Sequence, residues 1–395
     1  MDGATPRLLQ WPVLRIAPQG RIGVTIFSFL TGYVCAIKPL SQIRAGDPSA
    51  ALSTVSKSAF RRTPRLLLPA TIVTCISWLL CQLGAFKVAL RSESEWLRFA
   101  SPHQGKTLSG AVWALLRNIT RTWTRAWNEY DHHQWTLFPL LKGAMMVYVA
   151  ISATVYMKSR YRMLTTFIIY MYYFLSGEAT FGMQFFFGML LFDFSDHAPA
   201  QEFIAKRRWI RTVLPPILIS IGLGLASYPN DNPEWAPWSK ALFDFHTYFM
   251  PDEVDIPRFY SGIGLNFVTL GIQLSPITKD ILASKFLLWL GKNSFAIYLI
   301  HGTLLRTILA YMVYGITVPS QADIINDKGE RVPPPFTPQN GPWVVWASVP
   351  IWLGIVYFLA HLWTTYVDAT CARLSQRLEG YVFKETEKSS GPLLG

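Results

Sequence analysis

Residues 131–157 read DHHQWTLFPLLKGAMMVYVAISATVYM, and this stretch decides the class of fold. From position 137 onward, Lys142 is its only charged residue. About 20 apolar residues in a helix cross the roughly 30 Å hydrocarbon core of a bilayer, so the run predicts a membrane span. The segment Asp131-His132-His133 stands at the start of this span, and ionisable groups at membrane depth usually carry function.

Further apolar runs extend this prediction to the whole chain. Hydrophobic residues make up 51% and charged residues 15% of the 395 residues, a composition typical of integral-membrane proteins. About nine runs approach the length of a span, and they cover 22–37, 66–83, 137–157, 163–175, 181–194, 213–226, 259–274, 295–312 and 344–362. We therefore expect an all-α, polytopic helical bundle with one membrane domain over 1–380 and a polar cytoplasmic tail over 381–395. The short link at 176–180 predicts a tight hairpin of the fourth and fifth runs.

The net charge of +12 is distributed as a membrane protein requires, which favours the lipid bilayer over nucleic acid as the partner. Basic residues cluster beside the spans at 38–65, 158–162 and 206–211, whereas the segment 227–258 is acidic. The positive-inside rule places the basic loops and the C-terminus in the cytoplasm and residues 131–135 at the outer face. We expect a multi-pass protein of the endoplasmic reticulum or another endomembrane.

Between the second and third spans, apolar residues recur at helical spacing. Leu108, Ala111, Val112 and Leu115 predict an amphipathic helix that lies in the membrane interface. The sequon Asn118-Ile119-Thr120 falls in the same segment and predicts a glycan on the lumenal side.

His301 is the first candidate for chemistry, because it stands deep in the run 295–312. With a span that starts near Asn293, the imidazole lies about 12 Å down the helix. A neutral imidazole there can remove the proton of a hydroxyl that attacks a thioester, which is the general-base step of acyl transfer. Arg306 and Asn293 would line the same polar cavity. The alternative is a structural histidine that bonds a neighbouring helix.

Asp131, His132 and His133 form a second candidate cluster at the outer face, with Trp135 as an interface anchor and Lys142 within the span. We predict that this cluster borders the substrate and that His133 takes part in catalysis; a solvated interface cluster is the alternative. Two histidines beside an aspartate lack a third ligand at suitable spacing, so no metal and no bound cofactor are expected.

Arg61, Arg62 and Arg65 stand just before the second span, on the cytoplasmic side. The guanidinium group matches phosphate oxygens, so this cluster suits the phosphates of a nucleotide-bearing acyl donor. Positive-inside anchoring alone would also produce it.

Five segments, in the same order, resemble motifs of the acyltransferase-3 family of integral-membrane O-acyltransferases, particularly its fungal members. They are FLTGYV (29–34) with KPL (38–40), FRRTPRL (60–66), QWTL (134–137) through KGAM (142–145), FGMLL (187–191) and LGKNSFAIYLIHG (290–302). The functional RxxR pair of the family falls on Arg62 and Arg65. The resemblance implies transfer of an acyl group, commonly acetyl from acetyl-CoA as cosubstrate, to a hydroxylated lipophilic small molecule, such as a secondary metabolite.

The chain departs from the family pattern at two places. The usual first helix, which carries an arginine and the histidine considered essential for transfer, has no counterpart before Arg21, and transfer then needs another base or is lost. Leu140 stands where the family has a glutamate, and Lys142 replaces its arginine. A non-catalytic or transporter-like membrane protein, with buried polar residues along a permeation path, is the alternative from another class.

Overall fold

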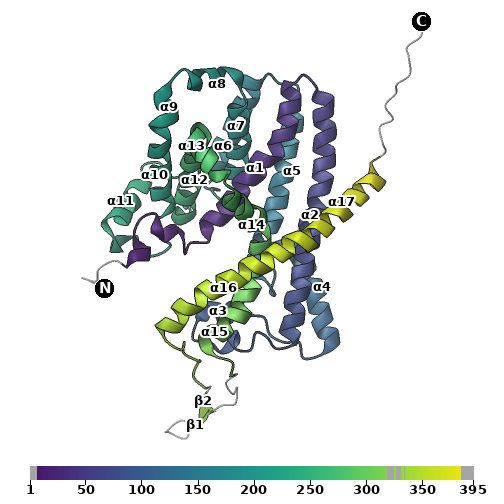
Figure 1. Cartoon of the computed structure of the whole chain (residues 1–395), viewed down its shortest axis with the longest axis vertical. Helices are drawn as coiled ribbons and strands as arrows, with labels where there is room; N and C mark the ends of the chain where they lie inside the picture. The colour runs from purple at the N-terminus through teal and green to yellow at the C-terminus, as the bar shows by residue number, and fades with distance from the viewer. Residues whose placement is uncertain (1–6, 318–323, 326–330, 333, 384–395) are drawn as a thin grey trace. The chain divides into compact units, whose positions relative to one another are not determined.

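A computed structural model describes residues 7–317, 324–325, 331–332 and 334–383. The described part is helical, as predicted, apart from a two-residue antiparallel pair of β1 (Ile324–Ile325) and β2 (Arg331–Val332) (Figure 1). The chain divides into two compact units, Met1–Phe60 with Pro139–Lys285 and Arg61–Phe138 with Phe286–Gly395. The tail predicted over 381–395 begins inside the last helix, and from 384 onward it lies outside the described residues.

The first unit is a bundle in which the helices approach closely at glycines. A side chain on Gly32 of α1 would collide with the backbone of Phe185 in α7, and Gly222 and Gly264 face each other between α10 and α12. Small residues at such crossings let helix backbones pack tightly where no hydrophobic effect drives association. The helices of this unit are α1 (Arg21–Arg44), the first part of α2 (Pro48–Gln82), most of α5 (Leu137–Ala153), α6 (Ser159–Leu175), α7 (Gly182–Ser195), α8 (Ala198–Ala205), α9 (Arg208–Thr212), α10 (Leu214–Ala226), α11 (Pro237–His246), α12 (Ile256–Leu274) and α13 (Pro276–Leu282).

A buried ion-pair cluster ties three helices of this unit together at one end. The Asp193 carboxylate accepts hydrogen bonds from Arg162 at 2.7 and 2.8 Å and from Arg44. The side chains of Asp193 and Arg162 are fully buried. Each charge has a bonded partner, which is the condition for placing charges in a low-dielectric interior.

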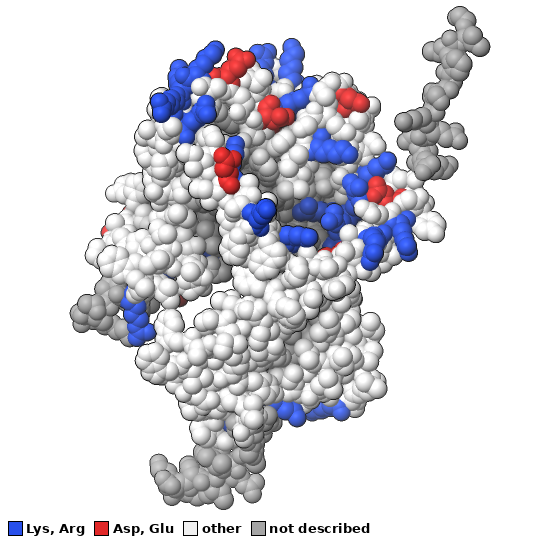
Figure 2. Space-filling view, in the orientation of Figure 1, with Lys and Arg blue, Asp and Glu red and all other residues white. Residues whose placement is uncertain are grey.

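The second unit carries the three segments that are candidates for chemistry, around His133, around His301 and at 61–65. Its core packs Leu137 and Leu299 with small alanines on α2, α14 and α16. The face of α15 and α16 shown in Figure 2 carries no charged side chain, because neither helix contains Lys, Arg, Asp or Glu. The helices of this unit are the second part of α2, α3 (Glu95–Ala100), α4 (Leu108–Arg125), η4 (His132–Thr136), α14 (Lys285–Leu304), the π-helical turn η6 (Leu305–Leu309), α15 (Ala310–Tyr314), α16 (Pro342–Leu362), the π-helical turn η7 (Trp363–Asp368) and α17 (Ala369–Val382).

Six of the described helical segments, rather than about nine, are long and apolar enough to cross a membrane: Arg21–Arg44, Pro48–Gln82, His132–Ala153, Arg208–Ala226, Lys285–Tyr314 and Pro342–Val382. The three other predicted spans fall in α6, α7 and α12. α7 has 14 residues, which give a length of about 21 Å, less than the roughly 30 Å of hydrocarbon. Most residues of α7 are buried, so it forms the inner arm of the predicted hairpin with α6.

The predicted amphipathic helix is present as α4. Leu108, Val112 and Trp113 lie on its exposed side, which is the apolar face that an interfacial helix presents to lipid. Asn118 lies on the opposite side and is fully buried, with its amide bonded to Ala114 and Glu129. The prediction of a glycan at Asn118 is therefore wrong for this fold, since a buried and bonded amide offers no attachment point.

Candidate active site

Two histidines that are far apart in sequence lie against each other in the second unit. His133 is part of η4 and His301 is part of α14, and the centroids of their rings are 4.3 Å apart. Both side chains are partly buried. α14 begins at Lys285 rather than near Asn293, so His301 lies about 24 Å along the helix instead of the predicted 12 Å.

The hydrogen bonds of the two rings select one tautomer. Nδ1 of His301 lies 2.9 Å from the carbonyl oxygen of Tyr298 and 3.0 Å from that of Ile297. A carbonyl only accepts, so Nδ1 carries a proton, and in the neutral ring Nε2 is the nitrogen with the lone pair. Nδ1 of His133 lies 3.3 Å from a carboxylate oxygen of Asp131, which selects the same tautomer. In the neutral form of each ring, Nε2 is therefore the nitrogen that can accept a proton.

Asp131 and Arg306 form a buried pair of charges behind the histidines. Nη2 of Arg306 lies 3.8 Å from Oδ1 of Asp131, and both side chains are almost fully buried. Burial alone would raise the pKa of the Asp131 carboxyl, but the hydrogen bond and charge of His133 and the charge of Arg306 lower it. The carboxylate thus stays ionised at neutral pH. Oδ2 of Asp131 has no hydrogen-bond partner among the described residues.

Arg306 donates to three backbone carbonyls, one in the preceding turn of its own helix and two in other segments. Nε donates to Gly302 at 2.9 Å, Nη2 donates to Tyr130 at 2.8 Å and Nη1 donates to Ala100. Arg306 stands in the π-helical turn η6, a local widening of the helix that is frequent at functional sites. Its side chain therefore joins α14 to α3 and to the segment before η4.

A network of buried amides and hydroxyls holds the backbone of Asp131 in place. Asn128 donates to Thr74 and to Gln134 at 3.0 and 3.2 Å, and its Oδ1 accepts from the backbone N–H of Asp131. Gln134 donates to Thr74 at 2.9 Å. Sequence reasoning gave none of these three residues a role, although Gln134 opens the QWTL motif. Their only signal is that polar side chains stand beside or within apolar runs.

A second bond connects η4 directly to α14. The hydroxyl of Tyr298 donates to the carbonyl oxygen of His133. The hydroxyl oxygens of Thr136 and Tyr298 are 2.5 Å apart. Gly302 allows the close approach of the two elements. A Cβ atom there would lie 2.8 Å from Cε1 of His133 and 3.1 Å from Oδ1 of Asp131. Only glycine fits this position without displacing His133.

The structure brings four predicted residues together, Asp131, His133, His301 and Arg306, but others lie apart. His132 points away from the pair, because its ring stacks on Phe99 and meets Trp127 edge-on. Trp135 is half-buried in η4. Asn293 is buried eight residues before His301, about 12 Å away along α14, and it donates to Trp289. Lys142 is exposed and belongs to the first unit.

The three arginines predicted to bind the donor occupy the start of the second unit's part of α2. Nε of Arg61 lies 3.5 Å from the Glu379 carboxylate of α17, and Arg65 is exposed. Thr74 of the polar network follows Arg65 by nine residues, or about 14 Å along the helix. Arg65 and Thr74, a member of the polar network beside Asp131, therefore stand about two and a half turns apart along α2.

The fold and this site define a class: a polytopic membrane protein with a pair of imidazoles, an ionised carboxylate and an arginine in a buried cluster. A family profile described as an acyltransferase domain, that of acyltransferase-3, matches residues 3–367. The chain belongs to this family, as the order of its motifs predicted. No solved structure matches the chain.

Several fungal proteins are similar to most of this chain. The O-acetyltransferase PaAT-1 of Phomopsis amygdali is 26% identical over 347 residues, which cover 76% of this chain and 65% of that protein. Acyltransferase R4 of a Phoma species is 22% identical, and acyltransferase clz18 of Cochliobolus lunatus is 24% identical. Each of these matches covers 73% of this chain and 69% of the relative. This chain therefore spans about two thirds of the length of the relatives it matches.

Proposed function

We propose that this protein transfers an acyl group, acetyl in the simplest case, from acyl-CoA to a hydroxyl of a lipophilic small molecule, in the biosynthesis of a secondary metabolite. The observation that carries the proposal is the His133–His301 pair, in which each Nδ1 faces an acceptor and each Nε2 is left basic. A buried, neutral imidazole is the group that activates a hydroxyl at neutral pH. Membership of the acyltransferase-3 family supports the reaction class.

The proposed step uses His301 as the general base. Nε2 takes the proton of the acceptor hydroxyl while the hydroxyl oxygen forms a bond to the thioester carbonyl carbon. The carbon–sulfur bond then breaks, and the departing thiolate of CoA takes the proton from the imidazolium. The products are the ester and CoA with its free thiol, so protons and electrons balance.

Asp131 and His133 are proposed to stabilise the positive charge that forms on His301 in this step. The imidazolium that forms on His301 carries a positive charge 4.3 Å, ring to ring, from the ring of His133, and the negative carboxylate of Asp131 lies behind both. A fixed carboxylate in a low-dielectric site stabilises developing positive charge more strongly than water does. Arg306 keeps the Asp131 carboxylate ionised and positioned.

Arg61, Arg62 and Arg65 are proposed to bind the phosphates of the acyl donor. Guanidinium groups hold phosphate oxygens through paired hydrogen bonds. Arg65 and Thr74 are about 14 Å apart along α2. In the proposed complex, the pantetheine arm of CoA would span this distance between the phosphates and the thioester. The apolar surface of α16 suits an acceptor dissolved in lipid.

The test is an acyl-transfer assay on the full chain purified in detergent. With radiolabelled acetyl-CoA and a panel of apolar alcohols, we expect label in an organic-soluble ester and one free CoA thiol for each ester formed. The alternative, a transporter, predicts that the alcohol crosses proteoliposome membranes while the thioester stays intact. That outcome would overturn the proposal.

Gly302→Ala is expected to lower transfer about 100-fold while the protein stays folded. The added Cβ pushes the His133 ring away, and a displacement of about 1 Å at a reacting group costs rate on this order. Gly291→Ala is the matched control, because it lies on the same helix with nothing within 4 Å of the added atom. Equal rates for the two variants would show that the His133 position does not matter to the reaction.

A further inference from the structure

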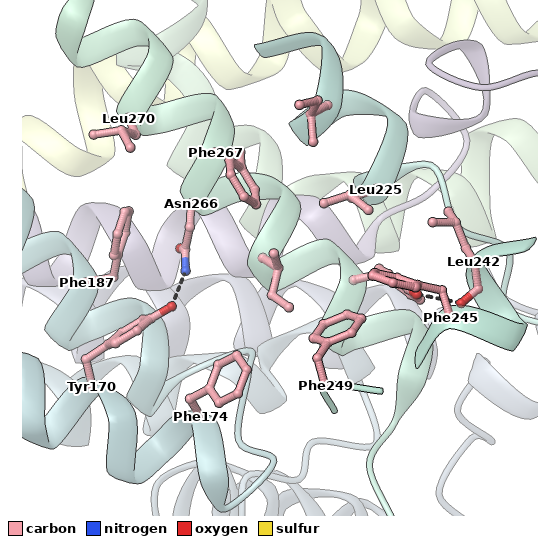
Figure 3. A pocket seen from close by; sticks show the side chains of 13 residues that line it. Tyr170, Phe174, Phe187, Leu225, Leu242, Phe245, Phe249, Asn266, Phe267 and Leu270 are labelled. Atoms are coloured by element: carbon pink, nitrogen blue, oxygen red, sulfur yellow. Dashed lines mark hydrogen bonds between the residues drawn. The ribbon is translucent and has the colours of Figure 1, made fainter. Parts of the chain in front are cut away.

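The first unit contains a cavity that the proposed chemistry does not use. Its volume is about 570 Å³, and it lies between α6, α7, α10, α11 and α12 (Figure 3). Aromatic rings dominate the lining, among them Phe174, Phe187, Phe245, Phe249 and Phe267. This volume falls in the range of about 300–1,000 Å³ that is typical of small-molecule sites.

We propose that this cavity binds an uncharged, apolar molecule with a single hydroxyl group, of the size of a sterol or a terpenoid alcohol. No charged residue lines it. It therefore does not suit the phosphates of acyl-CoA or the charged headgroup of a phospholipid, since such groups need charged or multiple polar partners when they leave water.

One polar pair in the lining gives the cavity its specificity. Asn266 is 7% exposed, and its Nδ2 donates to the hydroxyl of Tyr170 at 3.1 Å. Its Oδ1 is buried without a hydrogen-bond partner among the described residues. An unsatisfied buried acceptor destabilises the folded protein, and a ligand hydroxyl that donates to Oδ1 would remove this cost.

The neighbouring Tyr170 completes the recognition of a hydroxyl. Its oxygen accepts from Asn266, so its own proton is directed elsewhere and can be donated to a ligand oxygen. Asn266 and Tyr170 thus present one acceptor and one donor side by side, the complement of an alcohol. They stand at one side of the cavity in Figure 3 and Leu242 stands at the other, where its carbonyl is already satisfied by Tyr260. The apolar body of the ligand would cover the rings between them.

This inference stands apart from the proposed acyl transfer, since it rests on no residue of the histidine site. The same ligand chemistry has two sources, a membrane sterol and the acceptor alcohol of the transfer reaction. Both bring one hydroxyl on an apolar skeleton. The experiment therefore includes a competitor of each kind.

The test is photoaffinity labelling of the purified full chain with a diazirine analogue of cholesterol. We expect saturable labelling of peptides from α6 and α12, reduced by excess ergosterol or by the terpenoid alcohol geranylgeraniol, but not by cholestane, which lacks the hydroxyl. The stronger competitor identifies the source. Equal competition by cholestane, or labelling that does not saturate, would overturn the proposal. Either result would show non-specific adsorption to an apolar surface.

Variants separate the polar pair from the apolar lining. Asn266→Leu keeps the volume but removes the acceptor, and we expect about tenfold weaker binding, equivalent to about 1.4 kcal/mol. Thr269→Val is the control, because its hydroxyl lies on the same helix, outside the cavity, and bonds the carbonyl of Leu265. Leu225→Trp fills the cavity and should abolish labelling even if Asn266→Leu does not fold. If Leu225→Trp were labelled as strongly as the wild type, this cavity would be excluded as the site.

Discussion

We expect His301→Gln to lower the rate of the proposed acyl transfer by about 10²–10⁴-fold, the range that general-base catalysis contributes. Glutamine keeps a polar side chain that can bond the carbonyls of Ile297 and Tyr298, but it takes no proton at neutral pH. The measurement is kcat with saturating acetyl-CoA and an alcohol that wild-type protein esterifies.

The control for this variant is His361→Gln. His361 is also a histidine in an apolar helix, α16, but it is exposed and lies near Trp289 rather than the His133 ring. Its rate should equal that of the wild type. A normal kcat for His301→Gln, with the protein folded, would remove this residue from the mechanism and leave His133 as the base.

Arg306→Met is expected to destabilise the protein by about 3–5 kcal/mol, because it leaves the buried Asp131 carboxylate without its cation and removes the donors of three carbonyls. For a chain of 395 residues this corresponds to a fall of about 5 °C in the melting temperature. Thermal unfolding in detergent, followed by tryptophan fluorescence, measures it.

Arg121→Met serves as the comparison for Arg306→Met. Arg121 also forms an ion pair, with Glu129 at 3.3 Å, but both side chains are about one third exposed. Exposed pairs contribute at most about 1 kcal/mol. Equal melting temperatures for the two variants would show that the Arg306–Asp131 pair is not a structural support.

The class of fold and the family could be predicted because they depend on local sequence. Apolar run length alone places α1, α5 and α16, and the motif LGKNSFAIYLIHG coincides with the part of α14 that carries His301. The length criterion failed at α7, because a short helix buried among other helices is as apolar as a span. Sequence cannot tell the two kinds of helix apart when both lack charges.

The contents of the site were only half predictable. Separate reasoning marked His133 and His301, but their contact joins segments 168 positions apart, and no local pattern encodes it. The roles of Thr74 and Asn128 arise only from that contact, since each is an ordinary polar residue in isolation. Asn266 was overlooked for the same reason. A single amide in an apolar helix can be recognised as a ligand-binding residue only when the cavity that it lines is known.

The Arg306–Asp131 pair has a consequence for the electrical balance of the proposed reaction. One fixed cation and one fixed anion cancel, so with neutral imidazoles the proposed reaction starts from a site without net charge. During turnover the imidazolium and the thiolate appear together, again with opposite signs. The proposed step therefore creates no net charge that an ion from bulk solvent would have to balance, which suits a site where counter-ions are scarce.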